Sequence, residues 1–477
     1  MSRSMKLQRV RDPLYNLIEF REERVDDLLW QIIQTEAFQR LRRIKQLGFS
    51  EFVYPGATHT RFAHSLGVFH LARRLIEIID VKLKKRGSPT SNNAEKDAAL
   101  CAALLHDLGH GPFSHAFEEV GKKFQLASVN HESITDKLIR EGEIGVILDR
   151  YYKGFRNNVA AAIGEHSDIY SSVVSGQFDA DRLDYMQRDR MMTGTNTGNV
   201  DLEWLFSNIE IEEVEFSADE ETVYKADAMV LNPKGLLAAE AYALNLFQLY
   251  PTVYYHKTTR CMEKIFSELM YLLISRIRDT ANKGLRISED HPICKFVNDM
   301  SSWQSSLLLD DTVIWGMLEQ LRGADDRNIR ELSERLYNRK LFKSIKMPIK
   351  DVLIKNNIKK KEQDKEEIIK RFLNKAYPDL LSDIKNWNDE HSNVSDKIFM
   401  DMVRRGSYNN PKANRSRSNQ ILAVDEKQRI VSLTDISDVV RSIGPFVEIR
   451  GYVSEYGGDA ENYLKDRVKN YKMTEVA

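Results

Sequence analysis

The segment from Ala98 to Leu105 is uninterrupted apolar sequence, and it runs directly into His106 and Asp107. It is rich in alanine and leucine, which favour helices, and a helix that is apolar on every side must be buried in a core. Gly109 to Pro112 cannot continue such a helix, because glycine and proline end helices. We therefore predict a helix over Ala94–Leu108 at the centre of a mainly α fold, with a His-Asp pair at its C-terminal end.

Helical periodicity extends through most of the first 290 residues. An amphipathic helix is predicted from Phe62, with apolar residues at three- and four-residue spacing: Leu66, Phe69, Ala72, Leu75, Ile76 and Ile79. Further helices are predicted at about Phe178–Met192, at Pro233–Lys283 with a break near Pro251, and at Trp315–Leu321 and Ile329–Leu341.

Small β elements accompany the helices. Val214–Ala226 alternates between apolar and polar residues around a turn at Ser217–Glu220, which predicts a β-hairpin. Near the end of the chain, short apolar runs around a predicted helix at Asp435–Ile443 indicate a small α+β lobe: Ile421–Val424, Ile430–Leu433 and Phe446–Val453. We expect a first domain over residues 1–290 and a C-terminal helical and α+β lobe over residues 291–477.

The overall charge and the cysteines exclude several classes of protein. Lys and Arg number 70 and Asp and Glu 71, so no global field attracts nucleic acid or an anionic membrane. Cys101, Cys261 and Cys294 are widely spaced and odd in number, which fits neither a disulfide framework nor a zinc finger and favours a reducing cytoplasm. The sequence has no apolar run of membrane-spanning length, so we expect neither secretion nor membrane insertion.

The His106-Asp107 pair is the first candidate for chemistry. An ionised aspartate in so apolar a segment is costly unless it has a partner. A metal ion is one such partner, and a metal held by imidazoles and carboxylates lowers the pKa of a water and neutralises phosphate oxygens. The alternative is a helix-capping Asp107 beside a core His106 whose hydrogen bonds are satisfied.

Two other segments carry candidate partners for this pair. Arg61 and His64 stand three residues apart and therefore share one helical face. Asp181, Tyr185 and Asp189 form a stripe at successive fours. Such a stripe, taken alone, is also typical of a solvent-facing surface with ion pairs. The occurrence of three such segments in one chain favours a metal-dependent phosphohydrolase.

These segments resemble the HD superfamily of metal-dependent phosphohydrolases. Within it, three runs are similar to dNTP triphosphohydrolases, including those that join a sterile-alpha-motif domain to an HD domain: Phe38–Gly48, Arg61–Gly67 and His106–His115. The similarity runs in order over roughly residues 7 to 260. No sterile-alpha-motif segment precedes it, so we expect the chain to correspond to the catalytic portion alone.

The resemblance implies a metal centre and a catalytic histidine group. The expected ligands of a divalent ion are His64, His106, Asp107 and Asp181, which suit Mn, Fe, Ni, Zn or Mg. The expected catalytic residues, next to the phosphates, are Asp107, His110, His115 and His131. His115 is the candidate general acid for the leaving 5′ oxygen, because imidazole titrates near neutral pH. A surface position is the alternative for His131.

The resemblance also implies a deoxynucleotide pocket. Arg61 and Arg182 are expected to hold phosphates, and Gln46 and Asp189 to bind the sugar 3′ hydroxyl. The wall that leaves no room for a 2′ hydroxyl is expected from Leu47, Tyr185 and Tyr254. The implied reaction is hydrolysis of a dNTP at the α-phosphate to a deoxynucleoside and inorganic triphosphate.

The sequence departs from that family at two places. Leu246 and Tyr250 stand where the family has phosphate- and base-facing Arg and His residues. Gln34 replaces an aspartate that reads guanine in an activating nucleotide. The other residues that match this allosteric site are Val10, Gln39 and Arg42. We expect activation by a nucleotide and, by family analogy, a homotetramer built through the C-terminal lobe.

Two alternative functions remain at this stage. An HD phosphohydrolase acting on another nucleotide or on a nucleic-acid phosphodiester is one, and the basic run Lys412–Arg417 is its main support. A non-catalytic nucleotide-binding regulator is the other. All four ligand positions are filled, which argues against the regulator.

Overall fold

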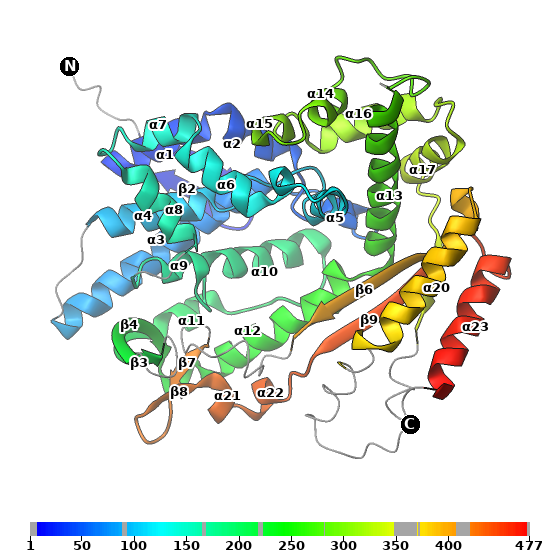
Figure 1. Cartoon of the computed structure of the whole chain (residues 1–477). Helices are drawn as coiled ribbons and strands as arrows, with labels where there is room; N and C mark the ends of the chain where they lie inside the picture. The colour runs from blue at the N-terminus through cyan, green and yellow to red at the C-terminus, as the bar shows by residue number, and fades with distance from the viewer. Residues whose placement is uncertain are drawn as a thin grey trace. The chain divides into compact units, whose positions relative to one another are not determined.

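The computed structural model describes residues 7–87, 93–164, 168–217, 223–280, 282–347, 370, 373–406 and 420–474 (Figure 1). The chain forms two compact units. The first comprises Met1–Tyr254, Lys295–Ile314 and Asn410–Ser442, and the second comprises Tyr255–Cys294, Trp315–Asn409 and Ile443–Ala477. Both units combine segments from before and after residue 290, so the domain border at that point stays a prediction. The run Lys412–Arg417 lies outside the described residues.

The first unit is mainly helical, as predicted. Its centre is α3 (Arg61–Arg86), which packs against α4 (Asn93–Leu105) and α10 (Ala180–Thr193). The other helices of this unit are α1 (Arg24–Ile33), α2 (Glu36–Arg40), α5 (His115–Phe124), α6 (His131–Arg140), α7 (Glu143–Leu148), α8 (Phe155–Gly164), α9 (Ser172–Ser175), α11 (Leu202–Ser207), α12 (Leu236–Leu249), α15 (Trp303–Ser306), α21 (Leu433–Ile436) and α22 (Asp438–Arg441). Short 3-10 turns occur at Leu41–Arg43, Gly48–Phe52, Ala127–Val129 and Pro233–Gly235.

Helix α4 is the buried helix that the sequence predicts. Every residue from Ala98 to Leu105 is buried, between α3 on one side and α8 on the other. The helix ends at Leu105, three residues earlier than predicted. The next residues form a turn that packs on α6, where the amide of Gly109 donates to Thr135 Oγ1 at 2.9 Å. A Cβ on Gly109 would lie 2.2 Å from the carbonyl oxygen of His131, so this close approach requires glycine.

The other predicted helices also occur, with shifted ends, except that two short helices, α21 and α22, replace the single one predicted at Asp435–Ile443. Helix α3 begins after Thr60, whose hydroxyl accepts from the amide of Ala63, and it ends at Gly87 in the left-handed conformation. The segment from Pro233 breaks into α12, a π-helical turn at Tyr250–Tyr254, and α13 (Lys257–Thr280), which confirms the break near Pro251.

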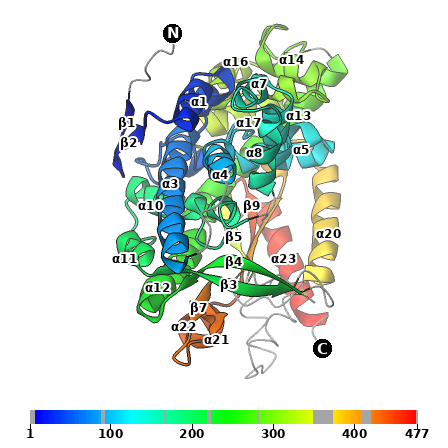
Figure 2. The same cartoon turned by 90° about the vertical axis from the view of Figure 1, so that its left-hand side faces the viewer.

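Three small sheets complete the fold. Strands β1 (Gln8–Asp12) and β2 (Asn16–Phe20) form an antiparallel hairpin. Strands β3 (Ile209–Ser217) and β4 (Val223–Leu231) form the predicted hairpin, seen edge-on in Figure 2, and residues 218–222 of its turn lie outside the described residues. Strand β4 also pairs in parallel with β7 (Leu422–Val424), which pairs with β8 (Ile430–Ser432).

The second unit contains the remaining sheet, in which β9 (Phe446–Val453) lies between β5 (Lys343–Lys346) and β6 (Phe399–Arg405). Helices α20 (Ala376–Glu390) and α23 (Asp459–Thr474) pack together, and their apolar side chains share a core with β9. Helix α13 packs against α17 (Arg327–Tyr337). Helices α14 (Pro292–Asn298) and α16 (Asp311–Leu321) cross the borders of the units, and a 3-10 turn lies at Val394–Asp396.

The predicted C-terminal α+β region is therefore confirmed, with its strands divided between two sheets. In the described part of the chain, no helix is both long enough and apolar enough to cross a membrane.

Candidate functional site

The four predicted metal ligands meet in the first unit. His64 comes from the first turn of α3, His106 and Asp107 from the turn after α4, and Asp181 from the first turn of α10. Nε2 of His64 lies 3.0 Å from Oδ1 of Asp181 and 3.6 Å from Oδ2 of Asp107. Nε2 of His106 lies 3.5 Å from Asp107 Oδ1 and 3.6 Å from Asp181 Oδ1.

Both histidine rings are held by their other nitrogen. Nδ1 of His64 lies 2.8 Å from Oδ2 of Asp184, and Nδ1 of His106 lies 2.9 Å from the carbonyl oxygen of Ala103. The two Nε2 atoms are buried, and both face carboxylate oxygens of Asp107 and Asp181. An imidazole that is fixed through one nitrogen and directs the other at carboxylates is the usual arrangement of a metal ligand. The side chains present therefore fit a divalent metal ion.

The electrostatics of the cluster call for a cation. Burial disfavours the charged ring of His64, yet Asp181 and Asp184 raise its pKa to about 10. Burial also opposes ionisation of Asp107, but Arg61 and the neighbouring histidines hold the pKa of its carboxyl well below the usual range. Burial likewise opposes ionisation of Asp181, but its contacts with His106 and His64 lower the pKa of its carboxyl. Two ionised carboxylates thus face one buried space, and in the metal-free chain protons on the imidazoles supply the positive charge.

Arg61, one of the two expected phosphate ligands, lies inside this cluster. Its Nη1 donates to Oδ2 of Asp107, and its Nε donates to Oγ of Ser114 at 3.0 Å. Arg182, the other, lies half-buried on α10 and donates to the carbonyl oxygen of Gly176 at 2.8 Å. Arg61 thus directly neutralises a predicted metal ligand.

The three predicted catalytic histidines form a second cluster. The rings of His110 and His131 stack with centroids 3.9 Å apart, and the ring of His115 lies 5.3 Å from that of His110. Nε2 of His110 lies 3.3 Å from Oδ1 of Asp107, which joins this cluster to the metal ligands. The His131 side chain thus stacks on His110 and is 20% exposed.

Glu118 organises this cluster, and the sequence analysis missed it. Its Oε2 lies 3.1 Å from Nδ1 of His115, and its Oε1 contacts Nδ1 of His131. Burial opposes its ionisation, but His115 and His131 lower its pKa. Burial and the charge of Arg61 hold the pKa of His110 well below the usual range, so that ring is neutral. The side chain of His115 is 72% exposed and accessible to a ligand. The spacing of three residues between His115 and Glu118 was the available sequence signal.

The predicted sugar pocket is built around Asp189. One carboxylate oxygen lies 2.9 Å from Nε2 of His59, and the other accepts from the hydroxyl of Tyr254 at 2.7 Å. The ring of Tyr254 lies 6.2 Å from that of Tyr185, edge to face. The amide of Gln46 donates to the carbonyl oxygen of His59 at 3.0 Å, which brings Gln46 and its half-buried neighbour Leu47 near the group. His59 was also missed, although it stands only two residues before Arg61.

Asp311 binds the backbone of two segments that contain predicted site residues, one at Lys45 and one at Phe113. Its Oδ2 accepts from the amide of Lys45 at 2.9 Å, and its Oδ1 accepts from the amide of Phe113 at 2.7 Å. Phe113 and Ser114 have φ angles of 52° and 57°, an uncommon conformation for these residue types that needs support from the surroundings. This buried carboxylate fixes the backbone before Gln46 and before His115.

Comparisons with known proteins agree with this geometry. The HD domain family matches residues 61–189, and the HD associated region matches residues 220–308. The uncharacterized protein YwfO of Bacillus subtilis is 33% identical over 341 residues, which cover 70% of this chain and 71% of YwfO. The chain belongs to the HD-domain family. Its fold and its His/Asp cluster support a metal-dependent hydrolase.

Other relatives cover less of the HD-domain chain or show its fold. A deoxynucleoside triphosphate triphosphohydrolase SAMHD1 homolog of Dictyostelium discoideum is 37% identical over 184 residues, 36% of this chain and 35% of that protein. SAMHD1 of Bos taurus is 49% identical over 112 residues, 23% of this chain and 17% of that enzyme. The crystal structure of a phosphohydrolase from Bacteroides thetaiotaomicron superposes with a TM-score of 0.67 at 24% identity, covering 94% of this chain and 100% of that chain.

The residues of the expected allosteric site divide into two places in the HD-domain chain. Nε2 of Gln39 donates to the carbonyl oxygen of Ile33 at 2.7 Å, and its Oε1 accepts from Nε of Arg42 at 2.8 Å. Val10 lies on β1, opposite Ile18 of β2. Gln34 is the C-terminal cap of α1. Gln39 and Arg42 therefore contact each other directly, and Val10 belongs to the β1–β2 hairpin.

The two residues that depart from the dNTP triphosphohydrolases lie at the end of α12. Leu246 is buried in α12, and the ring of Tyr250 lies 5.1 Å from that of Tyr254. Tyr250 thus adds an aromatic ring beside Tyr254, which binds Asp189. The dNTP triphosphohydrolases have a basic or imidazole side chain at this position.

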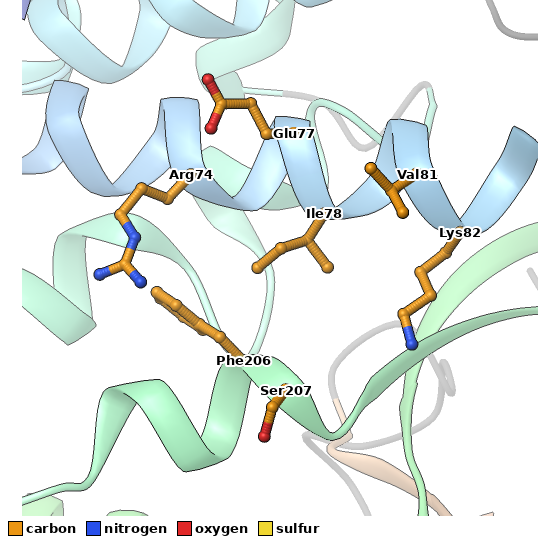
Figure 3. A pocket seen from close by; sticks show the side chains of 7 residues that line it. All are labelled: Arg74, Glu77, Ile78, Val81, Lys82, Phe206 and Ser207. Carbon is orange, nitrogen blue, oxygen red and sulfur yellow. The ribbon is translucent and has the colours of Figure 1, made fainter.

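A separate groove of about 400 Å³ runs along α3, away from the predicted site residues (Figure 3). Its lining comes from one face of α3 and from the end of α11: Arg74, Glu77, Ile78, Val81, Lys82, Phe206 and Ser207. Arg74 is paired with Glu203 and Lys82 with Glu210, each at 2.7 Å. Each of these two cations thus already has a carboxylate partner.

Proposed function

We propose that this HD-domain chain is a metal-dependent dNTP triphosphohydrolase that cleaves dNTPs at the α-phosphate into a deoxynucleoside and inorganic triphosphate. The observation that carries the proposal is the convergence of two buried imidazole nitrogens and two carboxylates beside a group of three histidines. The similarity to SAMHD1 proteins over part of the chain supports dNTPs as the substrate class.

His64, His106, Asp107 and Asp181 would hold the metal, which is Mn, Fe, Ni, Zn or Mg. A divalent ion in this position lowers the pKa of a water and neutralises phosphate oxygens. Arg61 donates to Asp107, one of these four residues, and its fixed planar cation suits a phosphate oxygen. Arg182, on the same turn of α10 as Asp181, is the second phosphate ligand of the proposal.

The histidine group would supply the proton for the leaving 5′ oxygen. His115 is the exposed member, and its Nδ1 is engaged by Glu118, so its Nε2 is free to donate to substrate. His110 and His131 stack beside it, and His110 stays neutral because of burial and the charge of Arg61.

The Asp189 group would select the sugar. Oε1 of Gln46 is buried and has no hydrogen-bond partner in the described part of the chain, so it offers an acceptor for the 3′ hydroxyl. The edge-to-face rings of Tyr185 and Tyr254, together with Leu47, would fill the space that a 2′ hydroxyl needs. Selection for deoxyribose is then steric.

The proposal includes regulation by analogy with the same enzymes. A nucleotide would bind near Val10, Gln39 and Arg42, and the chain would act as a homotetramer. A hydrogen bond holds Gln39 and Arg42 together, which supports a nucleotide contact at these two residues.

The test is product analysis with metal-loaded protein. Each dNTP, alone and in pairs, is incubated beside its NTP counterpart, and inorganic triphosphate is measured. We expect triphosphate from dNTPs and none from NTPs, none with His106→Ala, and full yield with His291→Ala, which alters a histidine that only caps α14. If no dNTP yields triphosphate but another phosphoester is cleaved in a His106-dependent manner, the other-substrate alternative holds. Nucleotide binding without any cleavage would favour the regulator.

A further inference from the structure

A continuous row of buried charges stands behind His64. Asp184, whose carboxylate contacts Nδ1 of His64, receives two hydrogen bonds from Arg188, each of 2.9 Å. Nη1 of Arg188 donates in turn to Oδ2 of Asp12 at 2.8 Å. The exposed fractions of Asp184, Arg188 and Asp12 are 0%, 1% and 4%. None of these three side chains is among the predicted metal ligands or substrate-binding residues.

The row is held rigidly against α3. Gly67 lies three residues after His64 on the same helical face, and a Cβ there would lie 1.9 Å from Oδ1 of Asp184 and 2.4 Å from Nη2 of Arg188. Because Gly67 has no side chain, the Asp184–Arg188 ion pair can pack directly against the backbone of α3. Asp184 therefore has little freedom to move away from His64.

The far end of the row belongs to the N-terminal hairpin. Asp12 is the last residue of β1, and its Oδ1 accepts from the amides of Leu14 and Tyr15 at 2.9 and 3.0 Å. One carboxylate thus shapes the turn of the hairpin with one oxygen and holds Arg188 with the other. The geometry of the turn is thereby linked to the orientation of the His64 ring.

We propose that Asp184 is a positioning residue of the metal centre, and that Arg188 and Asp12 extend this support to the β1–β2 hairpin, which contributes to metal affinity without supplying a ligand. The inference rests on the metal site of the proposed function. A carboxylate at Nδ1 fixes the tautomer and the direction of a metal-binding imidazole and makes its Nε2 a stronger donor. Arg188 holds that carboxylate in place with two hydrogen bonds, and Asp12 holds Arg188 in turn, so the direction of the His64 ring depends on all three side chains.

The experiment measures the Kd of Mn²⁺ by calorimetry on the chelator-treated full chain, and the Tm of the same samples without metal. Asp184→Asn preserves shape and removes the charge, and we expect its Kd to rise by about 10- to 100-fold. Asp12→Asn should shift the Kd in the same direction by a smaller factor. The matched control is Asp26→Asn, because Asp26 is a buried aspartate that pairs with Arg73 on the same helix α3. Asp26→Asn should lower the Tm and leave the Kd unchanged.

The outcomes separate positioning from ordinary stability. If Asp184→Asn and Asp26→Asn lower the Tm alike and neither changes the Kd, Asp184 is only structural and the inference is overturned. If Asp184→Asn does not fold, Arg188→Lys replaces it, since it keeps the charge and loses the two-pronged contact, and an unchanged Kd again overturns the inference. A different result, equal Kd for wild type and His64→Ala, contradicts the metal site itself.

Discussion

Replacing Gly67 with alanine tests how closely the buried ion pair packs against α3. In an ordinary helix interior this substitution stabilises by about 1 kcal/mol, because alanine is the better helix former. Gly67 is different, since the added Cβ would lie 1.9 Å from Oδ1 of Asp184 and 2.4 Å from Nη2 of Arg188. Either the pair moves together or it separates.

The expected loss follows from these two possibilities. Overpacking a well-packed core costs about 1–3 kcal/mol. Separating a buried Arg–carboxylate pair costs about 3–5 kcal/mol, since each charge is left without its partner. After the gain of about 1 kcal/mol in helix propensity, we expect Gly67→Ala to lower the free energy of unfolding by up to about 2 kcal/mol if the pair moves together and by about 2–4 kcal/mol if it separates. The larger loss is a substantial fraction of the stability of a typical domain.

Gly316→Ala is the matched control for this measurement. Gly316 lies within α16, and a Cβ there meets no atom within 4 Å, so the same change should stabilise by about 0.5–1 kcal/mol. The assay is urea unfolding followed by circular dichroism at equal protein concentration. A Gly67→Ala chain that gains as much stability as the Gly316→Ala chain would refute the close packing of Asp184 and Arg188 on α3.

Three further predictions concern the metal and substrate groups. Burial lowers the pKa of His64, but Asp181 and Asp184 raise it from 6.5 to about 10. The protonated ring therefore stabilises the metal-free chain fully below about pH 6.5, and this stabilisation is lost as the pH rises toward 10. The difference in Tm between wild type and His64→Gln should shrink over that pH range, and a constant difference contradicts this prediction. His115→Asn should reduce turnover by about 100-fold or more while the metal content measured by elemental analysis stays unchanged, whereas loss of metal would show that His115 is a ligand. Tyr185→Ala should raise triphosphate release from NTPs relative to dNTPs, and an unaltered ratio would remove Tyr185 from the sugar wall.

Local sequence pattern predicts the parts of the fold that depend on neighbours in the chain. Periodicity predicts the existence of α3, α4 and the β3–β4 hairpin, because it indicates which faces are buried. The signals are the apolar spacing of α3, the apolar run of α4 and the alternation in β3 and β4. The end of α4 was misplaced because Gly109 is held by α6, a contact that the local sequence does not contain. The pairing of β7 with β4 likewise depends on segments nearly two hundred residues apart.

The candidate site divides in the same way. His64, His106, Asp107 and Asp181 were predicted from their segments and from the resemblance to the HD superfamily, and the structure brings the four side chains together. Glu118, His59, Asp184 and Asp311 were missed because their roles arise from partners that the fold brings together, as when Asp311 accepts from the amides of Lys45 and Phe113. A lone acidic residue or histidine carries no signal of that kind in one sequence.

The most direct test of the metal centre is the metal content of the purified chain, measured by elemental mass spectrometry together with turnover. We expect about one divalent ion per chain in the wild-type protein, because in the proposed site the two imidazoles and two carboxylates would hold one ion. Asp181→Ala should lose both the ion and the activity. An Asp181→Ala chain that keeps a full complement of metal and full turnover would contradict the ligand assignment on which the account rests.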